Sequence, residues 1–113
     1  MENVNLVNCT PHKLVFELPD GTILELEPSG IIPRCVPIFK DAGIINGIPL
    51  HKTTLTDVEN MPDPCPNTIY IVSSFVAQAL SYRPDVVAPN TSPSMVVRDE
   101  KGNIIGVKGL QKF

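Results

Sequence analysis

Cys9 and His12 stand three residues apart near the start of the chain. A thiol and an imidazole form a nucleophile–base pair when they face each other. Pro11 lies between them in a segment that we expect to turn, so the spacing does not direct one group toward the other. Asn8, Thr10 and His12 have a second interpretation, because such side chains hold turns by hydrogen bonds to the backbone. The segment is therefore a candidate turn, a candidate ligand contact or part of a small hydrolase.

Cysteine and histidine are also metal ligands, and the chain has three cysteines and two histidines. They are Cys9, Cys35, Cys65, His12 and His51. Neither a C-x-x-C nor an H-x₃-H pair occurs, and structural zinc sites are built from such pairs. We therefore expect no metal and no other cofactor. An odd number of widely spaced cysteines favours free thiols in a reducing compartment.

Ser73 and Ser74 follow the most β-branched stretch of the chain, residues 68–72, and precede a candidate helix over residues 75–80. Amides at the start of a helix are unpaired and attract anions, and serine hydroxyls add further donors. The alternative is that one serine simply caps the helix. No G-x-S-x-G pattern surrounds either serine, so we expect no nucleophile elbow. Ser73 is the second nucleophile that the hydrolase interpretation could use.

Arg83 and Asp85 follow the candidate helix, on either side of Pro84. A guanidinium binds a phosphate or carboxylate through two parallel hydrogen bonds, and the alternative here is a local Arg–Asp pair. Farther along, residues 90–94 have the composition of a binding loop. The candidate ligand-binding residues are thus Asn8, Thr10, His12, Ser73, Ser74, Arg83, Asp85, Asn90, Thr91 and Ser92. We assign no catalytic residue.

Short elements must position these side chains, because 12 prolines and 7 glycines are scattered along the 113 residues. Proline excludes long helices over most of the chain. Alternating apolar residues around turn residues predict two β-hairpins, one over residues 14–27 and one over residues 95–107. Further strands are expected at residues 4–7, 31–36, 47–55, 68–72 and 85–88, and residues 39–46 are less patterned.

Helical structure is expected only at residues 75–80 and as one turn at residues 56–60, and three prolines make residues 61–66 an extended connector. The prediction is one domain, residues 1–113, with a β-rich α+β fold. It has about seven or eight short strands in a small sheet or barrel, with one or two short helices.

Composition excludes several classes of partner. Nine basic against twelve acidic residues give a net charge of −3, and no basic stretch offers a face for nucleic acid. No apolar run approaches the roughly 20 residues of a membrane span, and the first residues do not form a signal peptide. We therefore expect a cytoplasmic protein that binds neither nucleic acid nor membrane.

Several motifs spread over most of the chain resemble those of one family. They are N-x-T-P-H at residues 8–12, G-I-P at 47–49, P-N-T-I-Y-I-V-S at 66–73, R-P-D-V-V-A-P at 83–89 and R-D-E-K-G at 98–102. On these motifs the chain resembles a family of uncharacterised small proteins of bacteria and their phages. Cys9 stands where that family has leucine. The resemblance implies a protein of the bacterial cytoplasm and carries no catalytic residue.

Three classes of function compete, and the small hydrolase that would use Cys9 with His12, or Ser73, is the least favoured. The first is a non-catalytic binder of a nucleotide-like anion, working as a homo-oligomer because so small a domain has little concave volume. With the phage resemblance, this predicts a protein that sequesters a nucleotide immune signal of the host. The alternative is a protein–protein interaction or assembly factor, since strands interrupted by Pro33 and Pro49 and an apolar end at Phe113 suit subunit contacts.

Overall fold

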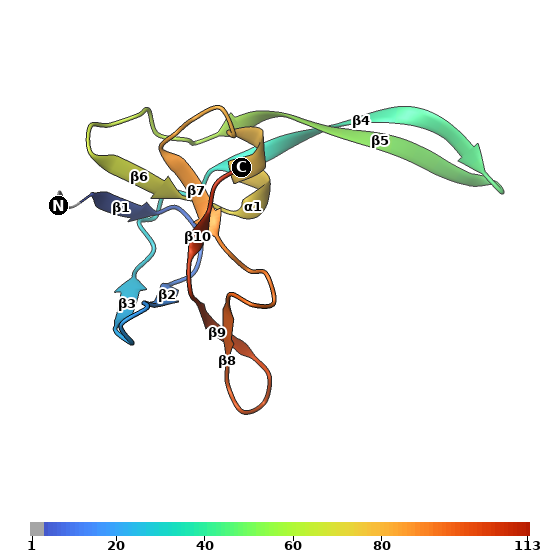
Figure 1. Cartoon of the computed structure of the whole chain (residues 1–113). Helices are drawn as coiled ribbons and strands as arrows, with labels where there is room; N and C mark the ends of the chain where they lie inside the picture. Colours follow the sequence, from blue (N-terminus) through green and yellow to red (C-terminus); the bar gives the residue numbers. More distant parts are fainter. Residues whose placement is uncertain (1–3) are drawn as a thin grey trace.

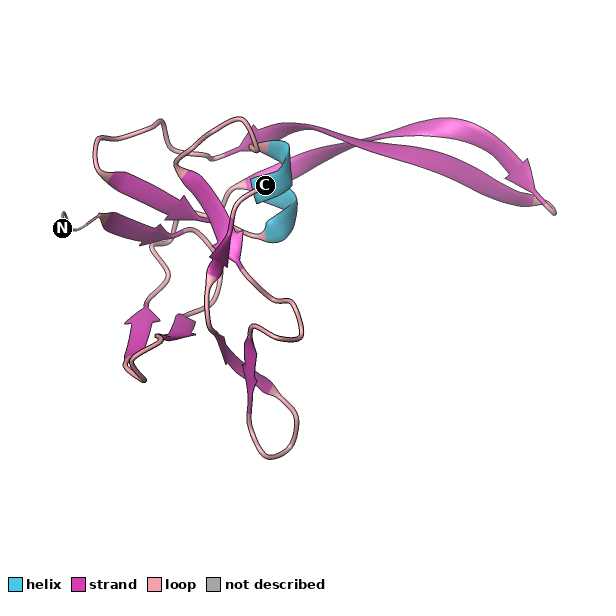
Figure 2. Ribbon diagram, in the orientation of Figure 1, coloured by secondary structure: helices cyan, strands magenta, loops and turns pink. Residues whose placement is uncertain are grey.

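The structure is a computed structural model that describes residues 4–113, apart from the side chains at position 37 and positions 54–57. In chain order its strands are β1 (Asn5–Asn8), β2 (Leu14–Glu17), β3 (Ile23–Leu26), β4 (Arg34–Ile45), β5 (Ile48–Glu59), β6 (Thr68–Ile71), β7 (Val86–Pro89), β8 (Val96–Arg98), β9 (Ile104–Val107) and β10 (Leu110–Gln111), and its helix is α1 (Ser74–Ala79). Figures 1 and 2 show short strands, one helix and one long hairpin. The predicted β-rich α+β class is confirmed, but none of the sheets in the described residues closes into a barrel.

The first sheet has the order β1-β6-β7-β10 and holds the main core. β6 pairs in parallel with β1 and β7, as its continuous β-branched sequence predicts for a central strand. Ile71 and Val72 at its end are fully buried. Val76 of α1 and Leu80 at its C-cap pack into the same core. The sheet therefore fixes the start of α1, which the chain enters directly from β6.

The second sheet, of order β3-β2-β9-β8, joins the two predicted hairpins. Each hairpin is antiparallel, and β2 runs parallel to β9 where Phe16 is the partner of Val107. Both side chains are buried with Ile71 of the first sheet, so the two sheets share this contact. The joint is tight, because a Cβ on Gly106 would lie 2.9 Å from the backbone oxygen of Val15.

β4 and β5 form a two-stranded hairpin, here called the arm, that projects from the rest of the molecule (Figure 1). Twelve residues per strand make it about 40 Å long at the usual rise of a strand. Its turn is Asn46-Gly47, with φ of 49° and 81°, as two-residue hairpin turns require. The arm explains a radius of gyration of 17.1 Å, against about 13 Å for a compact chain of this length.

Two expectations about this region are wrong, and residues 39–45, for which no element was predicted, are strand. Residues 56–59 continue β5 to Glu59 in place of the predicted helical turn. The predicted strand over residues 31–36 begins only at Arg34, directly after Pro33. The reason is that β4 pairs with β5. This pairing provides hydrogen-bond partners for the backbone of residues whose sequence has no clear strand pattern of its own. Pro49 is tolerated because each strand of the arm has one free edge.

Candidate functional site

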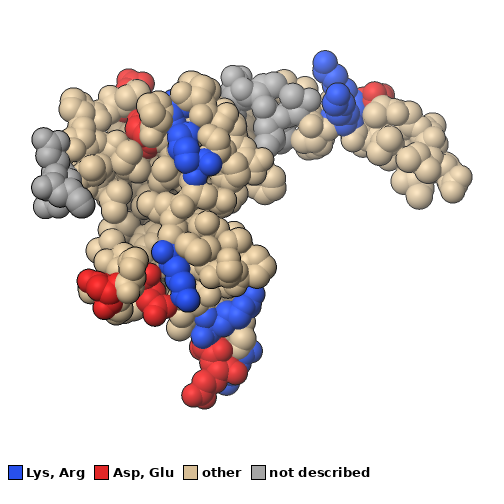
Figure 3. All heavy atoms as spheres, in the orientation of Figure 1, with Lys and Arg blue, Asp and Glu red and all other residues tan. Residues whose placement is uncertain are grey.

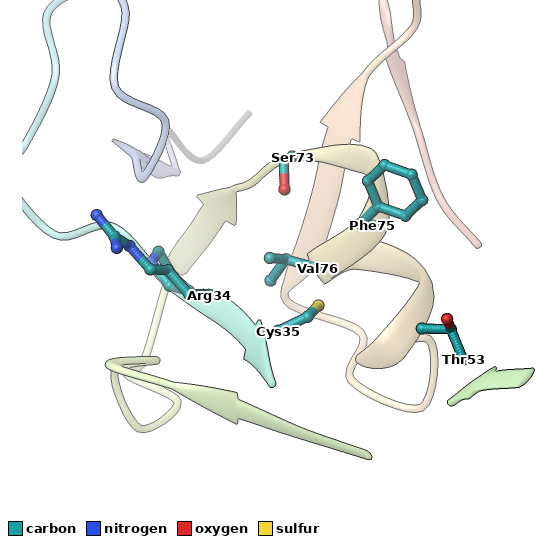
Figure 4. Close-up of a pocket in the computed structure, with 7 residues that line it drawn as sticks. Arg34, Cys35, Thr53, Ser73, Phe75 and Val76 are labelled. Atoms are coloured by element: carbon teal, nitrogen blue, oxygen red, sulfur yellow. The ribbon is translucent and has the colours of Figure 1, made fainter. Parts of the chain in front are cut away.

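A hollow of about 610 Å³ lies between the start of α1 and the root of the arm (Figure 4). Its lining residues are Pro33, Arg34, Cys35, Thr53, Ser73, Phe75 and Val76. Most of this lining is apolar, and Arg34 is its one charged residue. A largely apolar hollow with a few polar groups is the usual form of a small-molecule site.

Phe75 stands in the hollow because of helix geometry. The buried face of α1 carries Val76 and Ala77, which pack into the main core together with Leu80 at the C-cap. Phe75 falls on the opposite side of the helix at 100° per residue, and 69% of its surface is exposed. Its ring is therefore available for stacking.

Arg34 is the first residue of β4 and is exposed. Among the residues that the structure describes, none forms an ion pair or a side-chain hydrogen bond with its guanidinium. In Figure 4 the guanidinium points away from Phe75, at the other end of the hollow. It also lines an adjoining hollow of about 490 Å³ beside Glu59 and Asn60. A guanidinium that makes no ion pair with a described carboxylate is thus placed between two hollows, with Glu59 as its cross-strand partner on β5.

Ser73 occupies the N-cap position of α1 without making a side-chain cap hydrogen bond. Its backbone is extended and its side chain is exposed. In Figure 4 its hydroxyl points into the hollow, toward the side where Val76 lies. Capping therefore does not occupy this hydroxyl. Ser74 is half-buried as the first residue of α1 and does not line the hollow.

Asn8 and Thr10 form a buried turn network. The Nδ2 atom of Asn8 donates to the carbonyl oxygens of His12 at 2.8 Å and Leu26 at 2.9 Å. Its Oδ1 atom accepts from the backbone amide of Thr10 at 3.0 Å and from the Thr10 hydroxyl at 2.6 Å. These are the contacts expected if the side chains of this segment hold a turn. His12 is exposed beside this network.

Cys9 is 2% exposed in the main core. Burial raises the pKa of its thiol, and a hydrogen bond with Ser29 lowers the pKa by less than burial raises it. A raised pKa disfavours the thiolate that a nucleophile needs. The geometry at Cys9 is that of a structural core residue.

Arg83 and Asp85 form a mutual pair. Nε and Nη2 of Arg83 donate to the two carboxylate oxygens of Asp85 at 3.0 and 2.7 Å, and Nη1 donates to the carbonyl oxygen of Pro62 at 3.1 Å. The guanidinium also lies 5.9 Å from the centroid of the Tyr70 ring. The hydrogen bonds between the two side chains raise the pKa of Arg83 and lower the pKa of Asp85, so both groups are held in the charged form. The guanidinium of Arg83 is therefore already engaged by Asp85 and by Pro62 of the proline-rich connector.

Two residues of the polar loop after β7 also hydrogen-bond to each other. The amide and hydroxyl of Ser92 donate to Oδ1 of Asn90 at 3.2 and 2.8 Å. Thr91 lines a separate hollow of about 240 Å³ beside Ile104 and Ile105. Of the ten candidate residues, Ser73 alone lines the hollow beside α1. Ser74 follows it in the helix, and the other eight are distributed over three different places.

Arg34 and Phe75 are absent from the sequence-based candidates. Phe75 had a signal, because the spacing of Val76, Ala77 and Leu80 alone places an aromatic ring on the outer face of the helix. Arg34 had none, since its role depends on α1 reaching it from a distant part of the chain.

Within the described residues, no group of three or more His, Cys, Asp or Glu could hold a metal ion. In the same part of the chain, no helix has the length and apolar character needed to cross a bilayer. Comparison of the chain with family models, curated proteins and solved structures gives no match. The likeness to small bacterial and phage proteins therefore stays a prediction from the sequence motifs.

Proposed function

We propose that the protein is a non-catalytic binder of a nucleotide-like anion, which it holds in the hollow between α1 and the arm. One observation carries the proposal: an exposed aromatic ring, a hydroxyl free of capping and a guanidinium without a described counter-charge line the same hollow. Its volume of about 610 Å³ fits a ligand of nucleotide size.

The three groups match the three parts of such a ligand. A base would stack on Phe75, where stacking on an aromatic ring contributes about 1–3 kcal/mol. A phosphate would accept two hydrogen bonds from Arg34, which lies at the other end of the hollow from the ring. The hydroxyl of Ser73 would bind the sugar or a phosphate oxygen between them. These contacts orient a ligand and provide no group to cleave it.

Sequestration is the role that we propose for this binding, in the cytoplasm of a bacterial host. A phage protein that holds a nucleotide immune signal would withhold it from the effector that the signal activates. The phage-like motifs support this role, and the three free cysteines agree with a reducing compartment.

The test is to purify the protein from cells carrying a nucleotide-signalling defence and to denature it by heat. We expect mass spectrometry to detect an intact nucleotide in the supernatant and the ligand-free protein to gain thermal stability when that nucleotide is added. A released hydrolysis product would instead indicate an enzyme. The proposal fails if no nucleotide is released and none of a panel of linear and cyclic nucleotides shifts the melting temperature.

Matched variants locate the site. Arg34→Ala and Phe75→Ala should each weaken binding at least tenfold, about 1.4 kcal/mol. Arg98→Ala is the control, because Arg98 is an exposed arginine on the distant β8–β9 hairpin. Equal affinities for all three variants would place the ligand elsewhere.

The assembly role remains the second candidate function, and the arm favours it. Six large apolar side chains of the arm are exposed: Ile38, Phe39, Ile44, Ile45, Ile48 and Leu50. Exposed apolar patches of this kind mark interaction surfaces.

A further inference from the structure

Two hollows meet at Arg34, the first residue of the arm. The hollow beside α1, here called the first hollow, has a volume of about 610 Å³, and the adjoining second hollow has about 490 Å³. Each volume by itself lies within the range of about 300–1,000 Å³ that is usual for a small-molecule site. Of the residues that the structure describes, Arg34 is the one that lines both hollows. A ligand that fills both would therefore have two units, with its anionic group between them.

The second hollow differs from the first in its chemistry. Ile31 and Ile32 supply the apolar part of its lining, and Glu59 and Asn60 supply the polar part. Its described lining thus has a carboxylate and a carboxamide where the first hollow has an aromatic ring and hydroxyls. The two hollows are suited to different parts of one ligand.

The polar side chains of the second hollow are available to a ligand. Glu59 and Asn60 are exposed, and within the described residues neither makes a side-chain hydrogen bond or an ion pair. A carboxylate accepts hydrogen bonds from hydroxyls, and a carboxamide both donates and accepts them. An acidic side chain is the usual partner of the 2′ hydroxyl of a ribose. The second hollow therefore suits a nucleoside, with its ribose at Glu59.

The charges at the junction suit a phosphate that joins two nucleosides better than a terminal phosphate. Arg34 and Glu59 place one positive and one negative charge on the same hollow. A terminal phosphate carries roughly two negative charges at pH 7, and Glu59 would repel it. A phosphodiester carries one negative charge, which a single guanidinium can bind through two hydrogen bonds. The carboxylate of Glu59 is then left to face hydroxyls.

The surface charge limits the length of such a ligand. The chain has a net charge of −3, and on the face that Figure 3 shows the basic side chains form no continuous track. A longer nucleic acid needs a positively charged groove that follows its backbone. The two hollows therefore fit a ligand that ends after two nucleosides.

We propose that the ligand consists of two nucleosides joined through phosphate. One base stacks on Phe75 in the first hollow, the phosphate binds Arg34, and the second nucleoside lies in the second hollow against Glu59 and Asn60. This inference rests on the proposed function, and it names the class of nucleotide that the site takes. A single nucleotide would fill only the first hollow and would leave Glu59 and Asn60 without a ligand contact.

The first experiment compares two sets of ligands by calorimetry on the natural chain. The probes are the nucleoside 5′-monophosphates and the dinucleoside monophosphates, in which one phosphate joins two like nucleosides. We expect the best dinucleoside monophosphate to bind at least about tenfold more tightly than the matching mononucleotide, although it carries less charge. Equal affinities, or no binding of any dinucleoside monophosphate, overturn this inference. Nucleotide binding in the panel described above decides the proposed function separately.

The second experiment places the second nucleoside in the second hollow. Glu59→Gln keeps the size of the side chain and removes its charge, and Asn60→Gly removes the side chain at a position with φ of 62°, which glycine adopts freely. Each variant should lose at least about fivefold more affinity for the dinucleoside monophosphate than for the mononucleotide. Phe75→Ala should weaken the binding of both ligands. Equal losses of the two ligands in Glu59→Gln and Asn60→Gly would overturn the proposal.

Two substitutions of the same kind elsewhere in the chain serve as matched controls. Glu100→Gln changes an exposed carboxylate between β8 and β9, and Asn46→Gly changes an exposed asparagine with φ of 49° in the turn of the arm. Both proteins should keep the two affinities of the natural chain within about twofold. A loss in these controls equal to that in Glu59→Gln and Asn60→Gly would overturn the placement of the second nucleoside.

A deoxy probe tests the contact between Glu59 and the ribose. Removing the 2′ hydroxyls of the dinucleoside monophosphate should weaken its binding to the natural chain at least about fivefold more than its binding to Glu59→Gln. Equal losses in the two proteins would overturn this contact. A tetranucleotide that binds far more tightly than the dinucleoside monophosphate would indicate a site for a nucleic-acid strand and would overturn the proposal.

Discussion

At the scale of single residues, the structure decides between alternatives that residue type leaves open. Arg83 could bind either an anion or Asp85, and the geometry is that of the pair, with both side chains 13% exposed. Arg34 has the same side chain without a described partner, so it is the cation available to a ligand. Which arginine forms an ion pair depends on how the fold orients it against a carboxylate, and that is a property of the folded chain.

The Arg83–Asp85 pair carries a prediction for stability. Asp85→Asn should lower the free energy of unfolding at pH 7 by about 2 kcal/mol, because two charge-assisted hydrogen bonds lose their acceptor charge. The bonds with Arg83 hold the pKa of Asp85 below its ordinary value of 3.8. The contribution is therefore present above that value and is lost as pH falls through the lowered pKa. Urea unfolding of the natural protein and of Asp85→Asn should show that the difference between their free energies of unfolding becomes smaller in acid.

Asp41→Asn is the control for this measurement, because 98% of the Asp41 side chain is exposed. Its free energy of unfolding should stay within about 0.5 kcal/mol of the natural value. A gap for Asp85→Asn that persists unchanged in acid would contradict the role of the charge.

At the scale of elements, local sequence signals and pairing contribute differently. The two short hairpins and β6 follow their predicted positions, because alternation, β-branched residues and turn residues act within a few positions of each other. The arm had one such signal, Asn46-Gly47 between apolar residues, which is typical of a hairpin turn. Its strands then extend through residues without a clear pattern because each satisfies the other's backbone groups.

The joint between β2 and β9 carries the second prediction. Gly106→Ala should destabilise the protein by about 1–3 kcal/mol, since the new Cβ would lie 2.9 Å from a backbone oxygen of Val15 that cannot move alone. Gly109→Ala is the matched control. Its Cβ would meet only the flexible end of Met95, which can turn away. Thermal unfolding should separate the two variants, and equal losses would show that the joint is not tight.

At the scale of the whole molecule, the described residues divide into a packed body and an arm. The body has two sheets that share the buried contact at Phe16, Ile71 and Val107. The arm is supported only at its root, where α1 contacts β4 and β5. Local stability follows packing, so these parts should open at different free energies.

Hydrogen exchange tests this division. Amides of residues 70–72 should exchange most slowly, because they are hydrogen-bonded inside a buried sheet. Amides of residues 38–52 should exchange faster, because the side chains around them are exposed and the arm contacts α1 near its root. Equal exchange rates in the two regions would contradict the division into body and arm.

The sequence by itself determines the β-rich class, the absence of long helices, the two short hairpins, the central strand and the start of α1. Each of these depends on residues close together in the chain, and local backbone preference is enough to specify them. Only the tertiary structure decides that Asn8 and Arg83 are engaged, that Arg34 makes no ion pair with a described residue and that Phe75 shares a hollow with it. Those facts depend on contacts between distant segments, and contacts of that kind arise from packing that no local pattern encodes.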